Sequence, residues 1–489
     1  MRGSQVVDFA ENSGRTPWLE LLLVVAVLLM NGCVVGPNYH TPVTEIPPVY
    51  KEAENWKPAQ PNDQNLGGDW WTIFQDPQLN GLEQQVNVSN QNLKAAEAQY
   101  RQAREVLLYN RADYYPTVTA GPSATRTRVS SHRPPPNSIF NGITENDFVL
   151  PIDFSYQVDV WGRVRRTVES SREQAQASAA DLATVNLSMH ADLAVDYFQA
   201  RSLDAEEQLL LSTVKQYEQA LELTQTRFQG GFSSEVEVQQ AKTQLETTRA
   251  LAIDVGVLRA QFEHAVAILI GKPPADLTLP PLPLTAPPPA IPVSMPSELL
   301  ERRPDVAASE RRVASANAQI GVAKTAYYPL ITLSGGGGFE SSNITTLLNG
   351  PSGLWSFGLS AAWTVFDVGR RRALTAEARA AYDVQVATYR QNVLTAFQQV
   401  EDNLAAVRIL ENEAKVQEEA VVAAQRSLDL SNTRYTGGVT SYLEVIVAQS
   451  AALSDEVTAV NILGRRMVDT VLLIQALGGG WDRSTLPKL

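Results

Sequence analysis

The sequence has little of the chemistry that catalysis and nucleic-acid binding require. Its 489 residues include one cysteine, Cys33, which excludes a disulfide framework and a cysteine-rich zinc site. The net charge of −13 and the lack of a basic segment argue against a nucleic-acid partner. The histidines are widely spaced and form no ligand pair: His40, His132, His190 and His264. We therefore expect no enzyme, no metal site and no cofactor other than a covalent lipid.

Long apolar runs are also missing beyond the N-terminus. The ten residues Leu21–Met30 are too few to span ~30 Å of hydrocarbon as a helix and are typical of a signal-peptide core. The following segment, 29–33 (Leu-Met-Asn-Gly-Cys), resembles a bacterial lipobox, although Asn31 is unusual there. The pattern predicts a signal peptide over residues 1–32 and lipidation of Cys33. The alternative is a plain secretory signal followed by an unrelated cysteine.

What the sequence does contain is an internal duplication. Three segments recur between 207 and 213 residues later, with nearly constant spacing between them. The matching pairs are 114–116 with 327–329, 162–163 with 369–370, and 227–241 with 434–448. A period of this length exceeds that of solenoid repeats, so we interpret it as a duplicated unit of domain size.

The duplication sets the expected domain organisation. Each repeat predicts a helix, a β-hairpin, a long helix and, after a Gly-Gly turn, a second helix. Ten prolines between the repeats exclude a helix there and predict an extended segment. The expected segments are 33–78 (extended, lipid-anchored), 79–271 (first repeat), 272–296 (Pro-rich linker), 297–478 (second repeat) and 479–489 (tail). The hairpins are expected at 116–160 and 330–367, and the helix pairs at 163–228 with 234–270 and 370–435 with 441–477.

The predicted strands have two different faces. Apolar residues alternate with small polar ones over 148–160 and 355–366, a longer pattern than the ~5–6 residues of an average soluble strand. This suits tilted transmembrane strands with a wet inner face. Four strands per chain cannot close a barrel, and lipid excludes an open edge, so several chains must combine. The alternative is the edge of a half-buried soluble sheet.

The predicted helices carry narrow apolar stripes. Val393, Phe397, Val400, Leu404 and Val407 are spaced alternately by four and three residues, as in a coiled-coil seam. The segment 163–227 contains neither proline nor glycine and has the length for a helix of ~100 Å. A conduit needs such a helix, whereas a single compact domain does not.

The sequence resembles a known family. The segment 33–39 (Cys-Val-Val-Gly-Pro-Asn-Tyr) is similar to the mature start of OprM-like efflux lipoproteins. The two Gly-Gly-x-x-Ser-x-x-Glu-Val turns resemble those of TolC-family, NodT-type outer-membrane factors. The resemblance implies an α+β membrane protein: a homotrimer with a 12-stranded outer-membrane β-barrel, continued by a long periplasmic α-helical barrel with an equatorial belt.

The resemblance also implies a function. Such a channel passively conducts small, often toxic molecules from the periplasm to the exterior, after docking to a periplasmic adaptor and an inner-membrane RND-type pump. The exit duct of a type I protein secretion system shares this architecture and is the main alternative. A third candidate is a structural lipoprotein that tethers the outer membrane.

The two Gly-Gly turns are the candidate sites. Ser234 with Glu237, and Ser441 with Glu444, each match a capping box, and the glycines supply the left-handed positions that end a helix. Capping alone is a complete structural explanation. The resemblance adds a periplasmic constriction formed by Tyr435, Glu444 and Glu237. The adaptor-docking candidates are Arg227, Gly231, Ser234, Arg434, Gly438 and Ser441.

Two positions depart from the family pattern. Thr440 stands where some relatives have a basic residue, and Val447 stands where an acid is often found. We therefore expect no salt-bridged lock of the kind that these relatives use. A trimer would instead gather six glutamates near the tip, and a ring of like charges attracts cations.

Overall fold

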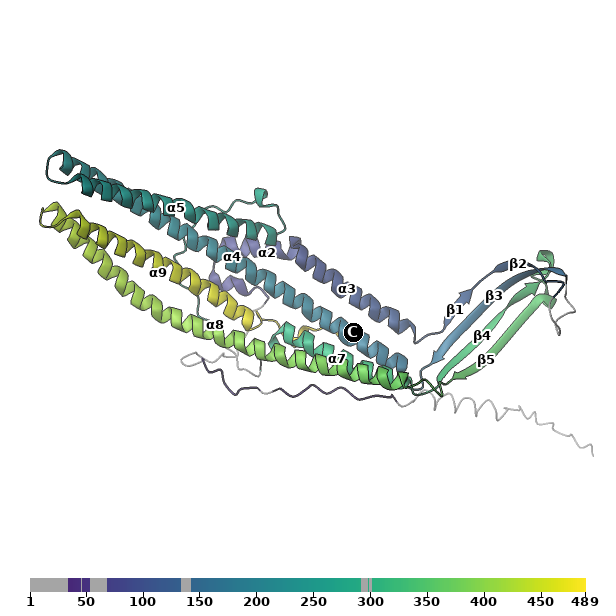
Figure 1. The fold of residues 1–489 in the computed structure, drawn as a ribbon. Helices are drawn as coiled ribbons and strands as arrows, with labels where there is room; N and C mark the ends of the chain where they lie inside the picture. Colours follow the sequence, from purple (N-terminus) through teal and green to yellow (C-terminus); the bar gives the residue numbers. More distant parts are fainter. Residues whose placement is uncertain (1–33, 45, 53–67, 133–141, 292–297, 299–300) are drawn as a thin grey trace, which may run out of the picture. The chain divides into compact units, whose positions relative to one another are not determined.

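The structure is a computed structural model of the chain (Figure 1). It describes all residues except 1–33, 45, 53–67, 133–141, 292–297 and 299–300, so the predicted signal peptide and Cys33 lie outside the described residues. The chain divides into two compact units. The sheet unit comprises the described residues of Met1–Thr41, Ala103–Gln174 and Arg312–Gln385, and the bundle unit comprises those of Pro42–Gln102, Ala175–Arg311 and Val386–Leu489. Each unit takes segments from both repeats, so the repeats are not two separate spatial domains.

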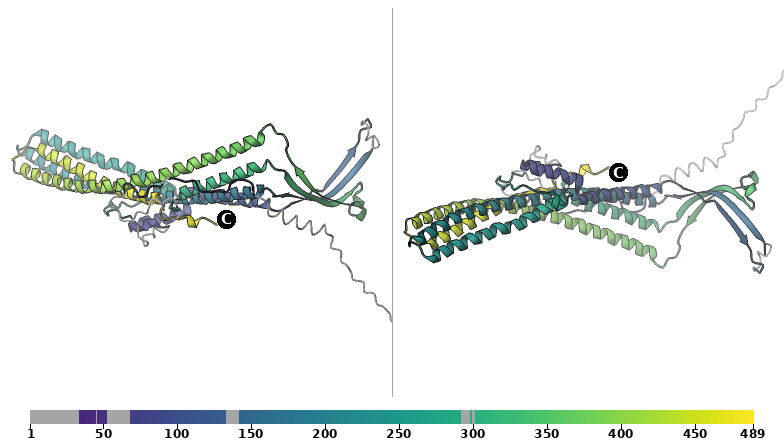
Figure 2. Two further views of the ribbon diagram at one scale, coloured as in Figure 1. Left: turned by 90° about the horizontal axis from the view of Figure 1, so that it is seen from below. Right: turned by 90° about the horizontal axis from the view of Figure 1, so that it is seen from above.

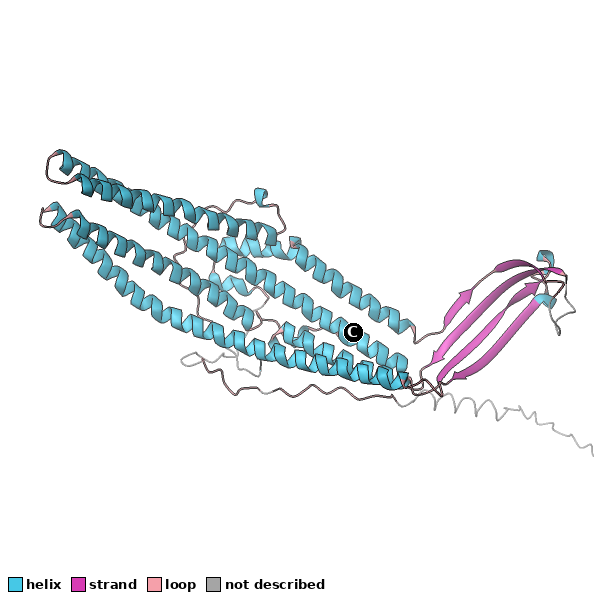
Figure 3. Cartoon of the chain, in the orientation of Figure 1, coloured by secondary structure: helices cyan, strands magenta, loops and turns pink. Residues whose placement is uncertain are grey.

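The sheet unit is built on an antiparallel sheet in the order β1-β3-β4-β5 (Figure 3). The strands are β1 (Thr117–Ala120), β2 (Ser123–Arg128), β3 (Thr144–Val158), β4 (Leu330–Ser341) and β5 (Gly353–Ala362). β1 and β2 pair with successive parts of β3, so they form one interrupted strand and the sheet is four strands wide. The central pair, β3 with β4, joins the two repeats.

The register gives the sheet one apolar and one polar face. Directly paired residues share a face, as Phe154 shares one with Gly335, and Asp153 shares the other with Gly336. The apolar face carries Val118, Phe148, Leu150, Ile152, Phe154, Tyr156, Val158, Ile331, Leu333, Phe339, Trp355, Phe357 and Leu359. The polar face carries Thr117, Thr119, Asp153, Ser155, Gln157, Thr332, Ser334, Ser356 and Ser360. The predicted alternation is confirmed within these strands.

The strand β5 is shorter than predicted. It ends at Ala362, where the sequence pattern continued to 367. Val368 and Gly369 have positive φ, 54° and 87°, which an extended strand excludes, so the chain turns at these two residues before the helix that begins at Arg370.

Four consecutive glycines in β4 allow the neighbouring strands to pack over it. A Cβ atom on Gly335 would lie 2.4 Å from Cε1 of Phe154, and one on Gly338 would lie 2.1 Å from the Leu150 carbonyl oxygen. The centres of the Phe154 and Phe357 rings lie 6.1 Å apart on the apolar face. The glycine run is therefore a packing feature of the strand.

The helices reproduce the duplication. α4 (Arg163–Gln229) and α8 (Arg370–Thr436) have 67 residues each, and α5 (Glu235–Leu269) and α9 (Tyr442–Ala476) have 35 each. The remaining α-helices given by the structure are α2 (Pro77–Ser89), α3 (Gln91–Ala112) and α7 (Pro304–Thr325). In the bundle unit, α4 lies beside α5 and α8 beside α9 (Figure 1, Figure 2).

The first repeat has two helices before its β-hairpin, so the prediction of a single helix there is wrong. The chain breaks at Asn90, which has extended backbone (ψ 125°) between α2 and α3. Its Oδ1 accepts from the Leu93 amide at 2.9 Å, and its Nδ2 donates to the Leu269 carbonyl at 2.8 Å. The side chain thus caps α3 and satisfies the end of α5, and these bonds compete successfully with continued helix.

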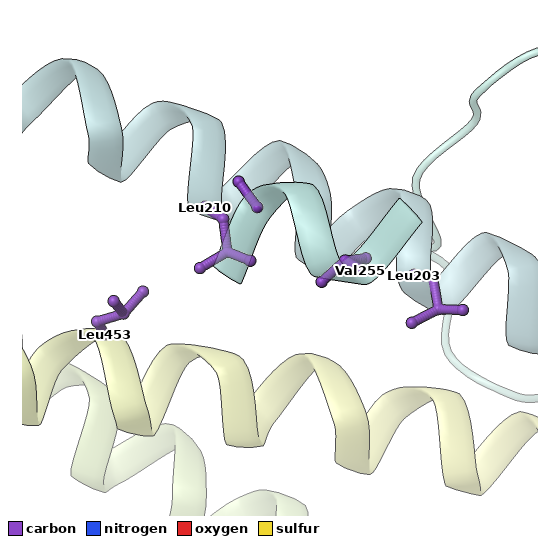
Figure 4. Close-up of a cluster of buried hydrophobic side chains, with 5 residues drawn as sticks. Leu203, Leu210, Val255 and Leu453 are labelled. Carbon is purple, nitrogen blue, oxygen red and sulfur yellow. The ribbon is translucent and has the colours of Figure 1, made fainter. Parts of the chain in front are cut away.

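The core of the bundle unit is a series of small clusters along the helices. Leu203 and Leu210 of α4 pack with Val255 of α5 and Leu453 of α9 (Figure 4). Neighbouring apolar side chains such as Ile253 remain 77% exposed in the single chain. Narrow buried stripes with exposed apolar flanks are typical of helices that pack side by side in larger assemblies.

The described part of the Pro-rich linker packs along the helices. Arg201 donates to the Pro280 carbonyl at 2.7 Å, and Arg259 donates to the Leu279 carbonyl at 2.5 Å. Both arginines also bind the buried carboxylate of Asp204, at 2.8 and 3.1 Å. Because these charges are paired and hydrogen-bonded, they fix the extended linker without an uncompensated buried charge.

A second buried polar contact joins α2 to α4. The Glu83 carboxyl and His190 Nδ1 lie 2.6 Å apart, and both side chains are almost fully buried. Burial raises the pKa of Glu83 to about 9 and lowers the pKa of His190 to about 4. The pair therefore holds one proton between these values and stays neutral overall.

Candidate functional site

The candidate residues lie at the α4–α5 turn and the α8–α9 turn. The second glycine of each turn, Gly231 and Gly438, has positive φ, 76° and 75°. The Phe232 amide returns to the Arg227 carbonyl at 2.8 Å, and an equivalent bond of 2.9 Å closes α8. This is the Schellman geometry in which glycine avoids a Cβ clash. The predicted helix-ending role is confirmed for these two glycines.

The serine half of the predicted capping box is confirmed at one turn and wrong at the other. Ser234 Oγ accepts from the Glu237 amide at 3.3 Å, whereas Ser441 makes no side-chain cap. Glu237 does not complete a reciprocal box. Its carboxylate instead accepts from the Ser233 hydroxyl and, at 3.5 Å, from the backbone N–H of Tyr442. The first residue of α9 is thus capped from the other repeat.

Arg227 also connects the two helix hairpins, which are α4 with α5 and α8 with α9. Arg227 Nη1 donates to the Thr436 carbonyl at 3.3 Å, and its guanidinium carbon lies 4.7 Å from the centre of the Tyr435 ring. A cation over an aromatic face contributes about 0.5–1 kcal/mol at exposed sites. Arg227 and Glu237 therefore join the hairpins through backbone and ring contacts.

Two tyrosines fill the space between the hairpins. Tyr435 is 4% exposed and Tyr442 is 2% exposed, with ring centres 5.2 Å apart. They pack with Ala241 and Val445. Burial raises the pKa of Tyr442 to about 12, so its hydroxyl stays protonated. The Tyr435 hydroxyl has no hydrogen-bond partner among the described residues. Its ring is core here, and its role in a constriction stays a prediction.

The remaining charged candidates pair within one hairpin. Arg434 Nη1 lies 3.4 Å from the Glu444 carboxylate, and both side chains are at least half exposed. This ion pair joins the end of α8 to the start of α9 and does not connect the two helix hairpins. Exposed pairs of this kind contribute about 0–1 kcal/mol.

An apolar rim surrounds the turns. Phe232, Val236, Val439 and Leu443 are 80%, 64%, 71% and 55% exposed. A hollow of about 510 Å³ lies beside them. Its lining is Glu235, Val236, Gln239, Gln240, Thr243, Gln244, Leu443 and Ile446. Exposed apolar side chains gathered at the turns, with Val236 and Leu443 lining one hollow, are typical of an interaction surface.

Sequence reasoning missed Tyr442 and Thr436. A usable signal exists for Tyr442, because the equivalent position of the first repeat is Glu235. When one copy of a duplicated turn has an acid and the other has an aromatic residue at the same position, the aromatic residue is expected to be buried. Thr436 contributes only a carbonyl oxygen, so no residue type identifies it.

The segment after the predicted lipidation site is fixed against the sheet unit. The Val35 amide donates to the Trp161 carbonyl at 3.1 Å, and Arg166 Nε donates to the Val35 carbonyl at 3.3 Å. Gly36 has φ 114°, and a Cβ there would lie 2.5 Å from Cα of Gly321. Only glycine fits this contact, so the chain that follows Cys33 is held where the strands meet the helices.

Within the described part of the chain, no group of three or more His, Cys, Asp or Glu residues is placed to hold a metal ion. None of the helices that the structure describes has both the length and the apolar character that crossing a membrane requires.

A duplicated chain with a two-faced sheet and paired long helices defines a class of fold found in channel subunits. The model of the outer membrane efflux protein family matches residues 82–272 and 295–479, and the chain belongs to this family. It is 31% identical over 467 residues to the probable efflux pump outer membrane protein TtgC of Pseudomonas putida, which covers 95% of this chain and 96% of that protein. The cation efflux system protein CusC of Escherichia coli is 29% identical and covers 95% of this chain and 99% of its own.

The fold is also that of solved outer-membrane channels. The structure of the channel OprN matches with a TM-score of 0.87 at 29% identity, covering 92% of this chain and 100% of that one. A structure of CusC matches with a TM-score of 0.82 at 26% identity, covering 91% and 100%. The family resemblance stated from the sequence is thereby confirmed.

Proposed function

We propose that this chain is the outer-membrane channel of a tripartite efflux system and passively conducts small molecules from the periplasm to the exterior. Family membership supports the role. The observation that carries it is the sheet with one apolar and one polar face. Apolar side chains such as Phe357 and Leu359 are 66% and 69% exposed in the single chain, which suits contact with lipid.

The edges of the sheet support an oligomer. Among the described residues, β5 pairs only with β4, while β1 and β2 pair only with β3. Open strand edges are excluded in hydrocarbon, so the edges of neighbouring copies must pair. Three copies of a four-stranded sheet give twelve strands, a ring wide enough for a polar lumen. We therefore infer a homotrimer whose lumen is lined by the polar face.

The apolar rim beside the helix turns is the proposed docking surface for a periplasmic adaptor. The chain supplies no energy source of its own in this scheme, so a partner pump of the inner membrane, of the RND type, drives export. Relatives include both a toluene efflux protein and a cation efflux protein, and in this proposal the partner pump selects the exported compound.

We also propose that Cys33 carries a covalent lipid. The contact of Val35 with Trp161 supports this, because it holds the residues that follow Cys33 beside the strand–helix junction, which we place at the inner surface of the membrane. Mass spectrometry of the N-terminal peptide tests the proposal. The expected result is an acylated Cys33 that is absent from Cys33→Ser, and an unmodified cysteine in wild-type protein contradicts it.

The channel itself is tested on the purified full-length protein. Native mass spectrometry is expected to give three copies, and planar bilayers are expected to show discrete ion conductance. A stable single subunit without conductance contradicts the proposed function. Co-purification from cells then distinguishes an RND-type pump from a protein-secretion exporter as the partner.

A further inference from the structure

The sheet unit contains a cavity of about 540 Å³ where the strands meet α7 and α8. This volume lies within the range of pockets that bind drug-sized molecules. Of its strand residues, Val158 and Ile331 belong to the apolar face of the sheet, and Gln157, Leu330 and Ala362 belong to the polar face. In the proposed function that face lines the conduction path, and the inference here depends on that assignment.

One wall of the cavity is apolar and rigid. Small and aliphatic side chains come from α7 and α8 (Val322, Ala323, Leu374, Ala378 and Ala381) and from the turn after α7 (Ala326). The Trp161 ring stacks on Tyr328 with centres 4.7 Å apart, and its indole N–H donates to the Pro329 carbonyl at 2.9 Å. Because the indole N–H already has a hydrogen-bond acceptor, a ligand can pack on the ring without leaving this N–H unpaired.

The three charged residues that line the cavity differ in whether their side chains have a bonding partner. Asp159 is paired with the Arg165 guanidinium at 3.2 Å and accepts from two backbone amides at the start of α4. Arg163 and Glu377 also line the cavity and are exposed, and among the described residues neither side chain has an ion-pair or hydrogen-bond partner. The cavity thus offers one free positive and one free negative group beside an apolar wall.

We propose that this cavity is a binding site on the export path for amphipathic zwitterions of drug size. The apolar body of the ligand packs on Trp161 and the helix alanines. Its ammonium group pairs with Glu377, and its carboxylate pairs with Arg163. A ligand with both charges satisfies both free side chains, whereas a simple cation or anion satisfies only one.

The test uses full-length protein in lipid nanodiscs and a zwitterionic fluoroquinolone, whose own fluorescence anisotropy reports binding. Its methyl ester, which keeps the ammonium group and lacks the carboxylate, is the matched probe. Glu377→Gln is expected to weaken both probes about fivefold, the effect of losing one partly exposed ion pair. Arg163→Gln is expected to weaken the fluoroquinolone by a similar factor and to leave the ester unchanged.

Two further variants separate the cavity from general surface charge. Ala381→Phe fills the apolar wall and is expected to abolish saturable binding of both probes, and Ala378→Leu is expected to weaken it without a bulky ring. Glu419→Gln and Arg426→Gln remove exposed charges from α8 outside the cavity and are expected to bind like wild type.

Three results overturn the proposal. They are equal losses in Glu377→Gln and Glu419→Gln, an ester that binds as tightly as the acid, and no saturable binding by wild type. Conductance of the same wild-type preparation in planar bilayers separates this failure from failure of the proposed function. A conducting protein that binds neither probe overturns the cavity assignment and leaves the proposed function standing.

Discussion

Glu237→Ala tests how the two helix hairpins are held together at their turns. The Glu237 carboxylate accepts from the Tyr442 amide at 3.5 Å, at a helix start that Ser441 leaves without a side-chain cap. Removing an N-terminal cap costs about 0.5–2 kcal/mol, typically about 1 kcal/mol. A change of about 1 kcal/mol shifts a two-state equilibrium about fivefold.

The assay is single-channel recording of the purified channel in planar bilayers. If separation of the hairpins opens the channel, Glu237→Ala is expected to raise the ratio of open to closed time about fivefold for each chain that opens independently. Glu237→Gln keeps an oxygen acceptor for the Tyr442 amide, so its ratio is expected to stay within about twofold of wild type.

Arg434→Ala is the matched control, because its ion pair with Glu444 lies within one hairpin. It is expected to leave the open-to-closed ratio unchanged. Equal behaviour of Glu237→Ala and Arg434→Ala, or no change in either, would refute the reasoning that the cap from the first repeat couples the hairpins.

Three more predictions concern charge, packing and pH. The double variant Glu237→Gln/Glu444→Gln is expected to lower cation relative to anion conductance, and unchanged reversal potentials in a salt gradient contradict this. Gly335→Val forces a phenylalanine ring of β3 to move, and it is expected to lower the free energy of unfolding, measured by thermal denaturation, by about 1–3 kcal/mol. Gly358→Val is the control, because a Cβ at this position meets no atom within 4 Å, and it is expected to lower the free energy of unfolding by less. The pKa of Glu83 is about 9 in the fold and 4.5 unfolded, so the stability advantage of wild type over Glu83→Gln is expected to shrink as pH rises from about 4.5 to 9. Melting curves across this range check the slope, and a pH-independent difference contradicts it.

The sign of the pH effect follows from the proton count of the buried pair. Folded, Glu83 and His190 hold one proton up to about pH 9. Unfolded, the histidine loses its proton near pH 6.5, so wild-type folding requires proton uptake above that value and weakens as pH rises. A glutamine cannot take part in this exchange, and the variant lacks the loss of stability between about pH 6.5 and 9.

The sequence predicted the features that depend on local pattern. The equal spacing of repeated motifs predicted two helix pairs of equal length, and the structure has 67 and 35 residues in each pair. The alternation around Ser356 and Phe357 placed these residues on opposite faces, because successive strand residues point to opposite sides. Both predictions need only periodicity and turn chemistry.

The features that were missed depend on contacts between distant residues. Asn90 interrupts a helix because its side chain reaches the Leu269 carbonyl, 179 positions away. Glu237 caps a helix that begins 205 positions later. Each residue type also fits the simpler local interpretation, a helix interior for the asparagine and a capping box for the glutamate. Only the tertiary arrangement decides between them.

The claim that the polar face of the sheet lines a water-filled path is tested most directly by paired cysteine variants. Ser356→Cys and Phe357→Cys are adjacent in β5 and lie on opposite faces, and Cys33 is the sole native cysteine. A charged, water-soluble thiol reagent applied during bilayer recording is expected to reduce the conductance of Ser356→Cys and to leave Phe357→Cys and wild type unchanged. A block of Phe357→Cys with no effect on Ser356→Cys would contradict the account.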